Sequence, residues 1–138
     1  MRKLFEGKTV VELGAGCWLS GLVASQFSKT TVLTDGSDVI MRLLQRNIHI
    51  QVEENGLAPG KVEARKLVWG EREEVETCTL EFGYPDVLLG ADVVCWPQFV
   101  GPFLQVRVES CTEVVVRNQY VDGRIKNLPL APCDKQAI

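Results

Sequence analysis

The sequence predicts an α/β fold of the Rossmann-like, doubly wound kind, with a mainly parallel, incomplete sheet of about five strands. Two observations favour this fold. Short apolar, β-branched segments alternate with amphipathic segments of helical spacing over the readable length of the chain, which is typical of βαβ units and parallel strands. The first two strands also each end at a glycine turn. We expect one partial domain over residues 1–121 and an irregular tail over residues 122–138.

The predicted strands are short runs of buried character between turn residues. They cover residues 9–13, 31–35 and 62–69, a segment within 85–94, and residues 112–117. The fifth run contains Val114-Val115-Val116, which is typical of a strand buried on both faces. Because no later segment is suited to pair with it, we expect an unfinished sheet edge and self-association through that edge.

The predicted helices lie between these strands. Residues 19–27 have helical apolar spacing, and residues 38–54 carry an apolar stripe with Ser37 or Gly36 as the cap and Asn55-Gly56 as the stop. A helical stretch follows Trp96-Pro97 to about residue 106. The acidic residues 71–81 are weakly patterned, so we expect a loop there with at most a short helix.

Composition excludes several classes of function. The 138-residue chain has a net charge of −3 with scattered basic residues, which argues against a nucleic-acid partner. No apolar run is long enough to span a membrane. The five cysteines form no CxxC pair and are odd in number, which argues against a metal site and a disulfide framework. Reduced thiols indicate a cytoplasmic or nuclear protein.

The strongest candidate site is a pair of turns. Glu12-Leu13-Gly14-Ala15-Gly16 follows the first strand, and Asp35-Gly36 ends the second strand, with Asp35 19 residues after Gly16. In a doubly wound sheet, ligands bind at the carboxyl ends of the strands where the strand order reverses. Glycines there allow close approach of a cofactor, and a carboxylate about 20 residues further on accepts hydrogen bonds from ribose hydroxyls.

The spacing favours one cofactor over another. A dinucleotide site needs a third glycine at the position of Leu19, and Glu12 lies outside that fingerprint. S-adenosyl-L-methionine carries an ammonium and a sulfonium group, for which carboxylates are suitable partners. Structural alternatives stay open, because the glycines could form only a tight turn and each of Glu12, Asp35 and Asp92 could be a strand-end or capping acid.

Four motifs occur in the order Val11–Gly16, Leu33–Gly36, Leu67–Gly70 and Gly90–Val94. Between about residues 7 and 103, the chain resembles the seven-β-strand (class I) AdoMet-dependent methyltransferases, and more narrowly the protein-lysine methyltransferases of methyltransferase family 16. The resemblance implies that S-adenosyl-L-methionine is the cofactor and that the substrate is a lysine side chain of a protein.

The resemblance also implies roles for single residues. Glu12, Gly14 and Gly16 would line the methionine side of the cofactor, and Asp35, in the Asp35-Gly36 turn, would hold its ribose. Trp69 would lie beside the adenine. Ala91 and Asp92 would lie near the methyl-transfer centre, where Asp92 would be the catalytic group that orients the amine or its departing proton.

Three departures from the family pattern support a second hypothesis. Trp18 stands where a third glycine is frequent in the family, and its indole would crowd the cofactor turn. Cys95 stands where an aromatic residue is usual. The sheet is also expected to have fewer than seven strands. The hypotheses are therefore an active protein-lysine methyltransferase, a truncated and inactive cofactor-binding or interaction module, and, third, an unrelated nucleotide-binding domain.

Overall fold

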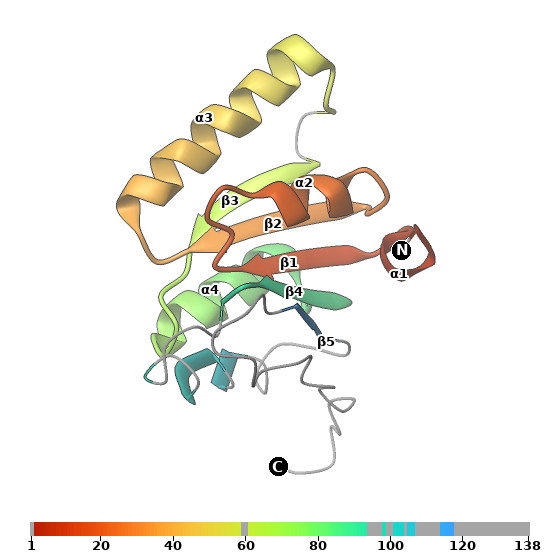
Figure 1. Ribbon diagram of the computed structural model, residues 1–138. Coiled ribbons are helices and arrows are strands. Elements are labelled where there is room, and N and C mark those ends of the chain that lie inside the picture. The colour runs from red at the N-terminus through yellow and green to blue at the C-terminus, as the bar shows by residue number, and fades with distance from the viewer. Residues whose placement is uncertain are drawn as a thin grey trace, which may run out of the picture.

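The computed structural model describes residues 2–58, 61–93, 98, 101–103, 105, 106 and 114–117. Of residues 114–117 it describes the backbone only. Its centre is a sheet of five parallel strands in the order β3-β2-β1-β4-β5 (Figure 1). The strands are β1 (Thr9–Leu13), β2 (Thr30–Asp35), β3 (Val62–Lys66), β4 (Val87–Ala91) and β5 (Val114–Arg117). The strand order reverses at β1, which has β2 on one side and β4 on the other, so the predicted fold class is confirmed.

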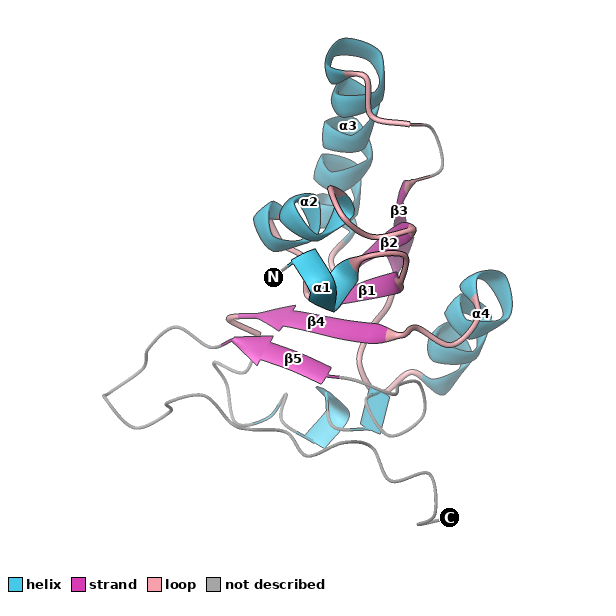
Figure 2. Cartoon of the chain, turned by 90° about the vertical axis from the view of Figure 1, so that its right-hand side faces the viewer, coloured by secondary structure: helices cyan, strands magenta, loops and turns pink. Residues whose placement is uncertain are grey.

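Helices cover both faces of this sheet (Figure 2). One face carries α1 (Arg2–Phe5), α2 (Leu19–Ser25) and α3 (Asp38–Asn55), and the other carries α4 (Arg72–Phe82) and the described helical residues between 98 and 106. Successive side chains of a strand point to opposite faces. Accordingly, Val11 and Leu13 of β1 belong to the apolar cluster under α4, whereas Val10 packs with α1 and α2.

Helix α3 forms as the sequence predicts. The Ser37 hydroxyl accepts a hydrogen bond from the amide of Ile40 at 3.5 Å, and Gly56 ends the helix with a left-handed φ of 69°. No described helix is both long and apolar enough to cross a membrane. The expected tail over residues 122–138 lies outside the described residues, and so does Cys95.

The expectation of a loop with at most a short helix over residues 71–81 is wrong, because an 11-residue helix, α4, covers nearly all of this segment. Only Val75 and Cys78 of this helix are buried, so its apolar stripe is too narrow to stand out in the sequence. The third strand is also shorter than expected and ends at Lys66.

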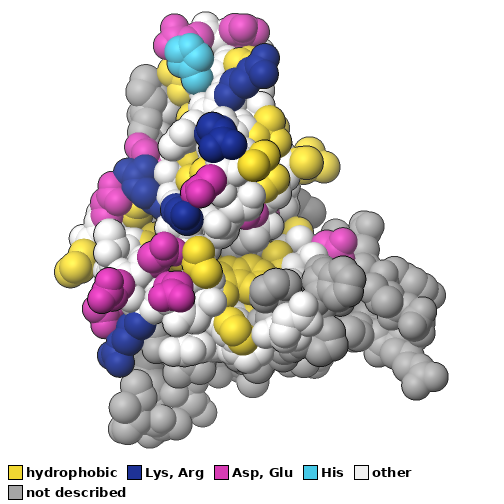
Figure 3. Space-filling view, turned by 90° about the vertical axis from the view of Figure 1, so that its left-hand side faces the viewer, with side chains coloured by type: hydrophobic (Ala, Val, Ile, Leu, Met, Phe, Trp, Pro, Cys, Tyr) yellow, Lys and Arg dark blue, Asp and Glu magenta, His cyan; other side chains and the backbone are white. Residues whose placement is uncertain are grey.

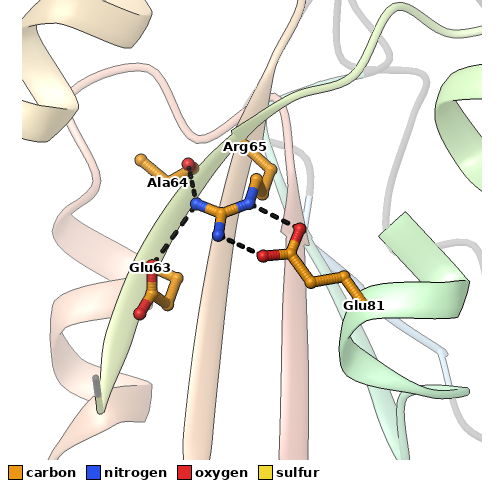
Figure 4. A network of polar contacts seen from close by, with 4 residues as sticks. All are labelled: Glu63, Ala64, Arg65 and Glu81. Atoms are coloured by element: carbon orange, nitrogen blue, oxygen red, sulfur yellow. Dashed lines mark hydrogen bonds and ion pairs between the residues drawn. The ribbon is translucent and has the colours of Figure 1, made fainter. Parts of the chain in front are cut away.

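Tertiary contacts fix α4 at both ends. Near its amino end, the Glu74 carboxylate accepts a hydrogen bond from the amide of Val68. At its carboxyl end, Arg65 of β3 forms a two-pronged ion pair with Glu81 (Figure 4). The Arg65 guanidinium also lies 5.0 Å from the centre of the Phe82 ring. These partners lie outside the helix, which is why helical spacing alone does not reveal it.

Candidate functional site at the carboxyl edge of the sheet

The turn after β1 is built on left-handed backbone. Gly14 and Gly16 have φ angles of 64° and 50°, values that glycine adopts without steric cost. The amide of Ala15, between them, donates to the carbonyl of Thr34 at 2.8 Å and so ties the turn to β2. A Cβ atom on Gly16 would find its nearest neighbour, the carbonyl oxygen of Gly14, 4.0 Å away. The backbone at Gly16 is therefore open to close approach by a ligand.

Asp35 joins the two predicted turns. Its Oδ2 accepts a hydrogen bond from the amide of Gly16 at 3.2 Å, and its Oδ1 accepts one from the amide of Ser37 at 2.9 Å. Its carbonyl accepts from Leu67 at 3.1 Å, which carries the β2–β3 pairing one residue beyond β3. A half-buried carboxylate thus lies directly against the glycine turn, as the spacing of the two turns predicts.

Trp69 lies on the other side of the turn. A Cβ atom on Gly14 would come within 2.9 Å of Val93 and 3.2 Å of the Trp69 indole, so only glycine fits beneath these two side chains. The indole also meets Phe103 edge to face, with ring centres 5.3 Å apart. The three predicted residues Gly14, Gly16 and Trp69 therefore share one small region.

Gly36, Ala91 and Asp92 complete the set of predicted residues at this edge. A Cβ atom on Gly36 would be 3.4 Å from Val68, so the turns after β2 and β3 pack together. Ala91 ends β4 and is half-buried. Asp92 follows it with an exposed side chain and a left-handed φ of 57°, a conformation that non-glycine residues rarely adopt.

Glu12 is placed differently from these residues. Its side chain is only 1% exposed and turns toward α2, where Ser20 Oγ donates to Oε1 and the amide of Gly21 also donates to the carboxylate. Its other oxygen, Oε2, is buried without a hydrogen-bond partner. Burial raises the pKa of Glu12 from its ordinary value of 4.5 to about 7, against the opposing effect of the two hydrogen bonds.

Trp18 does not crowd the turn, and that expectation is corrected. The indole is 7% exposed and belongs to an apolar cluster with Leu33, Met41 and Leu44 beneath α3. The backbone of Trp18 is left-handed, with φ 64°, and caps α2 without a side-chain hydrogen bond. Because the position after a tight turn can face either side, the sequence alone did not reveal that this indole faces the core.

The surface of this edge combines apolar and charged groups. Figure 3 looks onto the ends of the strands, where hydrophobic side chains gather at the foot of α3 and acidic and basic side chains flank them on one side. Lys66 pairs with Asp38 at 2.8 Å, an exposed contact between β3 and the start of α3. Pairing lowers the pKa of Asp38 and raises that of Lys66.

Comparison with known proteins identifies the family. The sequence profile of the lysine methyltransferase family matches residues 2–115. The chain belongs to this family. Among curated relatives, protein N-lysine methyltransferase METTL21A of Xenopus tropicalis is 31% identical over 105 residues, which cover 73% of this chain and 45% of the relative. Calmodulin-lysine N-methyltransferase of Arabidopsis thaliana is 33% identical over 99 residues, 69% of this chain and 30% of the relative.

Solved structures of the same fold extend the comparison. The DhpI–SAM–HEP complex matches with a TM-score of 0.57 and 15% identity over 84% of this chain and 49% of that chain. Protein arginine methyltransferase 10 of Arabidopsis thaliana matches with a TM-score of 0.53 and 15% identity over 80% of this chain and 29% of that chain. At 15% identity, these two matches show that the chain shares the fold of these structures. The chain spans less than half the length of the curated relatives described above.

Proposed function

We propose that this chain is the cofactor-binding part of an AdoMet-dependent protein-lysine methyltransferase. The observation that carries the proposal is the direct hydrogen bond between the Asp35 carboxylate and the amide of Gly16. It brings a glycine turn and an acidic strand end to one place at the point where the strand order reverses, which is where ligands of doubly wound sheets bind.

The residues present fit S-adenosyl-L-methionine. The open backbone at Gly16 allows close approach, and the half-buried carboxylate of Asp35 suits ribose hydroxyls as hydrogen-bond donors. Trp69, half-buried beside Gly14, offers an aromatic ring to the adenine. When bound, the cofactor supplies a methyl group on a positively charged sulfur. A neutral amine can attack that methyl carbon, and the sulfur leaves as a neutral thioether.

The protein's own contribution is to bind the lysine and orient it. A lysine amine has a free pKa near 10.4, so its proton must leave before the nitrogen can attack. Burial beside the apolar part of this edge favours the neutral amine. Asp92, exposed immediately after Ala91, would orient the amine or accept a hydrogen bond from it.

Asp35→Ala tests the site. Loss of its charge-assisted hydrogen bonds costs roughly 1.5–3 kcal/mol, so we expect S-adenosylhomocysteine to bind about 10- to 100-fold more weakly by calorimetry. Glu6→Gln is a matched control, because Glu6 is an exposed acid paired with Arg2 on α1. Circular dichroism checks that both variants fold. Unchanged affinity in a folded Asp35→Ala variant would contradict the assignment.

The second candidate function is a cofactor-binding module without catalytic activity, and a methyl-transfer assay distinguishes it from the enzyme. The chain would then bind S-adenosylhomocysteine but transfer no tritiated methyl group from S-adenosylmethionine to lysine-bearing proteins. Transfer that is lost in Asp92→Asn while binding persists would favour the enzyme.

A further inference from the structure

The amino-terminal end of helix α2 is capped by a side chain from strand β1. The residue at its own cap position is Trp18, whose side chain makes no capping hydrogen bond. The carboxylate of Glu12 takes that role, because it accepts from the hydroxyl of Ser20 and the amide of Gly21 in the first helical turn. A carboxylate at this end of a helix is stabilised by the unpaired amides and by the helix dipole.

Helix α2 also encloses the carboxyl group. A Cβ atom on Gly21 would collide with Glu12 Oε2 and with a methyl group of Leu33, so the helix backbone lies directly on the carboxylate. Glu12 is 1% exposed, and its Oε2 has no hydrogen-bond partner. A ligand at the glycine turn would therefore reach this group only through a shift of α2.

The surroundings of the Glu12 carboxyl group contain no compensating cation among the described residues. Helix α2 has no charged side chain. The register partners of Glu12 are Leu33 on β2 and Leu89 on β4, and Thr34 contributes only a neutral hydroxyl bonded to the carbonyl of Glu12. An uncompensated carboxylate of this kind attracts positive charge that arrives nearby.

We propose that Glu12 is a positioning residue, which holds the glycine turn through α2 and gives up a proton when the cofactor binds. This rests on the proposed function, because S-adenosylmethionine and its product both carry an ammonium group. The O–H bond of the neutral carboxyl group breaks and the proton passes to the solvent buffer. The ionised form accepts stronger, charge-assisted hydrogen bonds from Ser20 and Gly21, so binding and ionisation favour each other.

The coupling between cofactor binding and the ionisation of Glu12 predicts how the affinity for the cofactor depends on pH. The pKa of Glu12 lies at about 7, so its ionised fraction rises about tenfold between pH 6 and pH 8. If the cofactor binds the ionised form, affinity for S-adenosylhomocysteine rises about tenfold over the same interval and levels off above it. About half a proton is released per ligand bound at pH 7.

Calorimetric titration of the whole chain with S-adenosylhomocysteine measures both quantities. Runs at pH 6, 7 and 8 in buffers of different ionisation enthalpy give the dissociation constant and the number of protons released. We expect Glu12→Gln to remove the profile, whereas the control Glu6→Gln keeps it. Titration of the ligand itself is common to all variants and cancels in the comparison.

Ser20→Ala is the second variant and guards against a Glu12→Gln chain that does not fold. Removing the Ser20 hydrogen bond takes away an effect that lowers the pKa of Glu12, so the midpoint of the profile should move to higher pH. A residue that is merely structural would change affinity equally at every pH. Equal profiles in wild type and Glu12→Gln, or an unmoved midpoint in Ser20→Ala, would overturn the inference while leaving the proposed function intact. If wild type binds no S-adenosylhomocysteine at any of the three pH values, both fail.

Discussion

The two faces of the sheet are built from different chemistry. The face under α4 carries an apolar cluster that includes Val11, Leu88 and Phe103, and its ion pairs lie at the rim. The face under α2 and α3 encloses the carboxyl group of Glu12 among apolar side chains. One face contributes stability by burying hydrocarbon, whereas the other gives up part of that stability to keep an ionisable group beneath the glycine turn.

The same contrast holds for two acids, one on each face. Burial raises the pKa of Glu12, whereas the neighbouring Arg65 guanidinium lowers the pKa of Glu81. Stability should therefore depend on pH with opposite signs at the two positions. A buried, uncompensated acid favours folding when it is protonated, and a paired acid favours folding when it is ionised.

The largest expected effect comes from Glu12. Its pKa is about 7 in the folded chain and near 4.5 when exposed, so the folded state binds more protons between these values. The free energy of unfolding should fall by about 3 kcal/mol as the pH rises from 4.5 to 8. Urea unfolding of wild type and Glu12→Gln measures this: the two should match near pH 5, and the variant should be more stable at pH 8. Parallel curves would contradict the difference between the faces.

The next effect concerns Trp18, whose indole fills the core beneath α3. Trp18→Gly removes a large buried side chain, at a cost of about 3–5 kcal/mol, and recovers about 1–2 kcal/mol of left-handed backbone strain. A net loss of about 2 kcal/mol is expected in thermal or urea unfolding, with Trp18→Phe, which retains an aromatic ring, as the milder control. A more stable Trp18→Gly chain with tighter cofactor binding would show that the indole blocks the turn after all.

The smallest effect is expected at the rim. Glu81→Gln removes the exposed partner of Arg65, and because solvent screens such pairs we expect little change in the urea midpoint at pH 7. The contribution of Glu81 is present above its unfolded pKa and is lost as the pH falls through its lowered folded value. The stability of Glu81→Gln should therefore fall slightly less steeply with decreasing pH than that of wild type, and the two should meet in acid. A large loss of stability at neutral pH would show that this exposed ion pair contributes more than solvent screening allows.

Much of the fold could be predicted from the sequence because the signals are local. β-branched runs that end at glycine turns predict β1 and β2, a short apolar run predicts β4, and Ser37 and Gly56 bracket α3. Helix α4 could not be predicted, because Arg65 and Val68, which hold its two ends, lie outside the helix and do not contribute to its helical pattern.

The site shows the same division. The proximity of Asp35 to Gly16 follows from strand topology, and so could be expected. The inward orientation of Trp18 and the contact between Glu12 and Ser20 could not, because both depend on how α2 rests on the sheet. A serine eight residues after a strand acid is too common a pattern to indicate a cap.

Strand β3 forms one edge of the sheet, and its pattern of charge bears on how the protein avoids aggregation. Val62 and Ala64 are buried under α3, whereas Glu63 and Arg65 alternate with them on the opposite face and form an ion pair at 3.3 Å. Edge strands offer unpaired backbone groups to other chains, and inward-facing charges make such pairing costly, because a second strand would bury them. The network in Figure 4 therefore marks β3 as a protected border of the sheet.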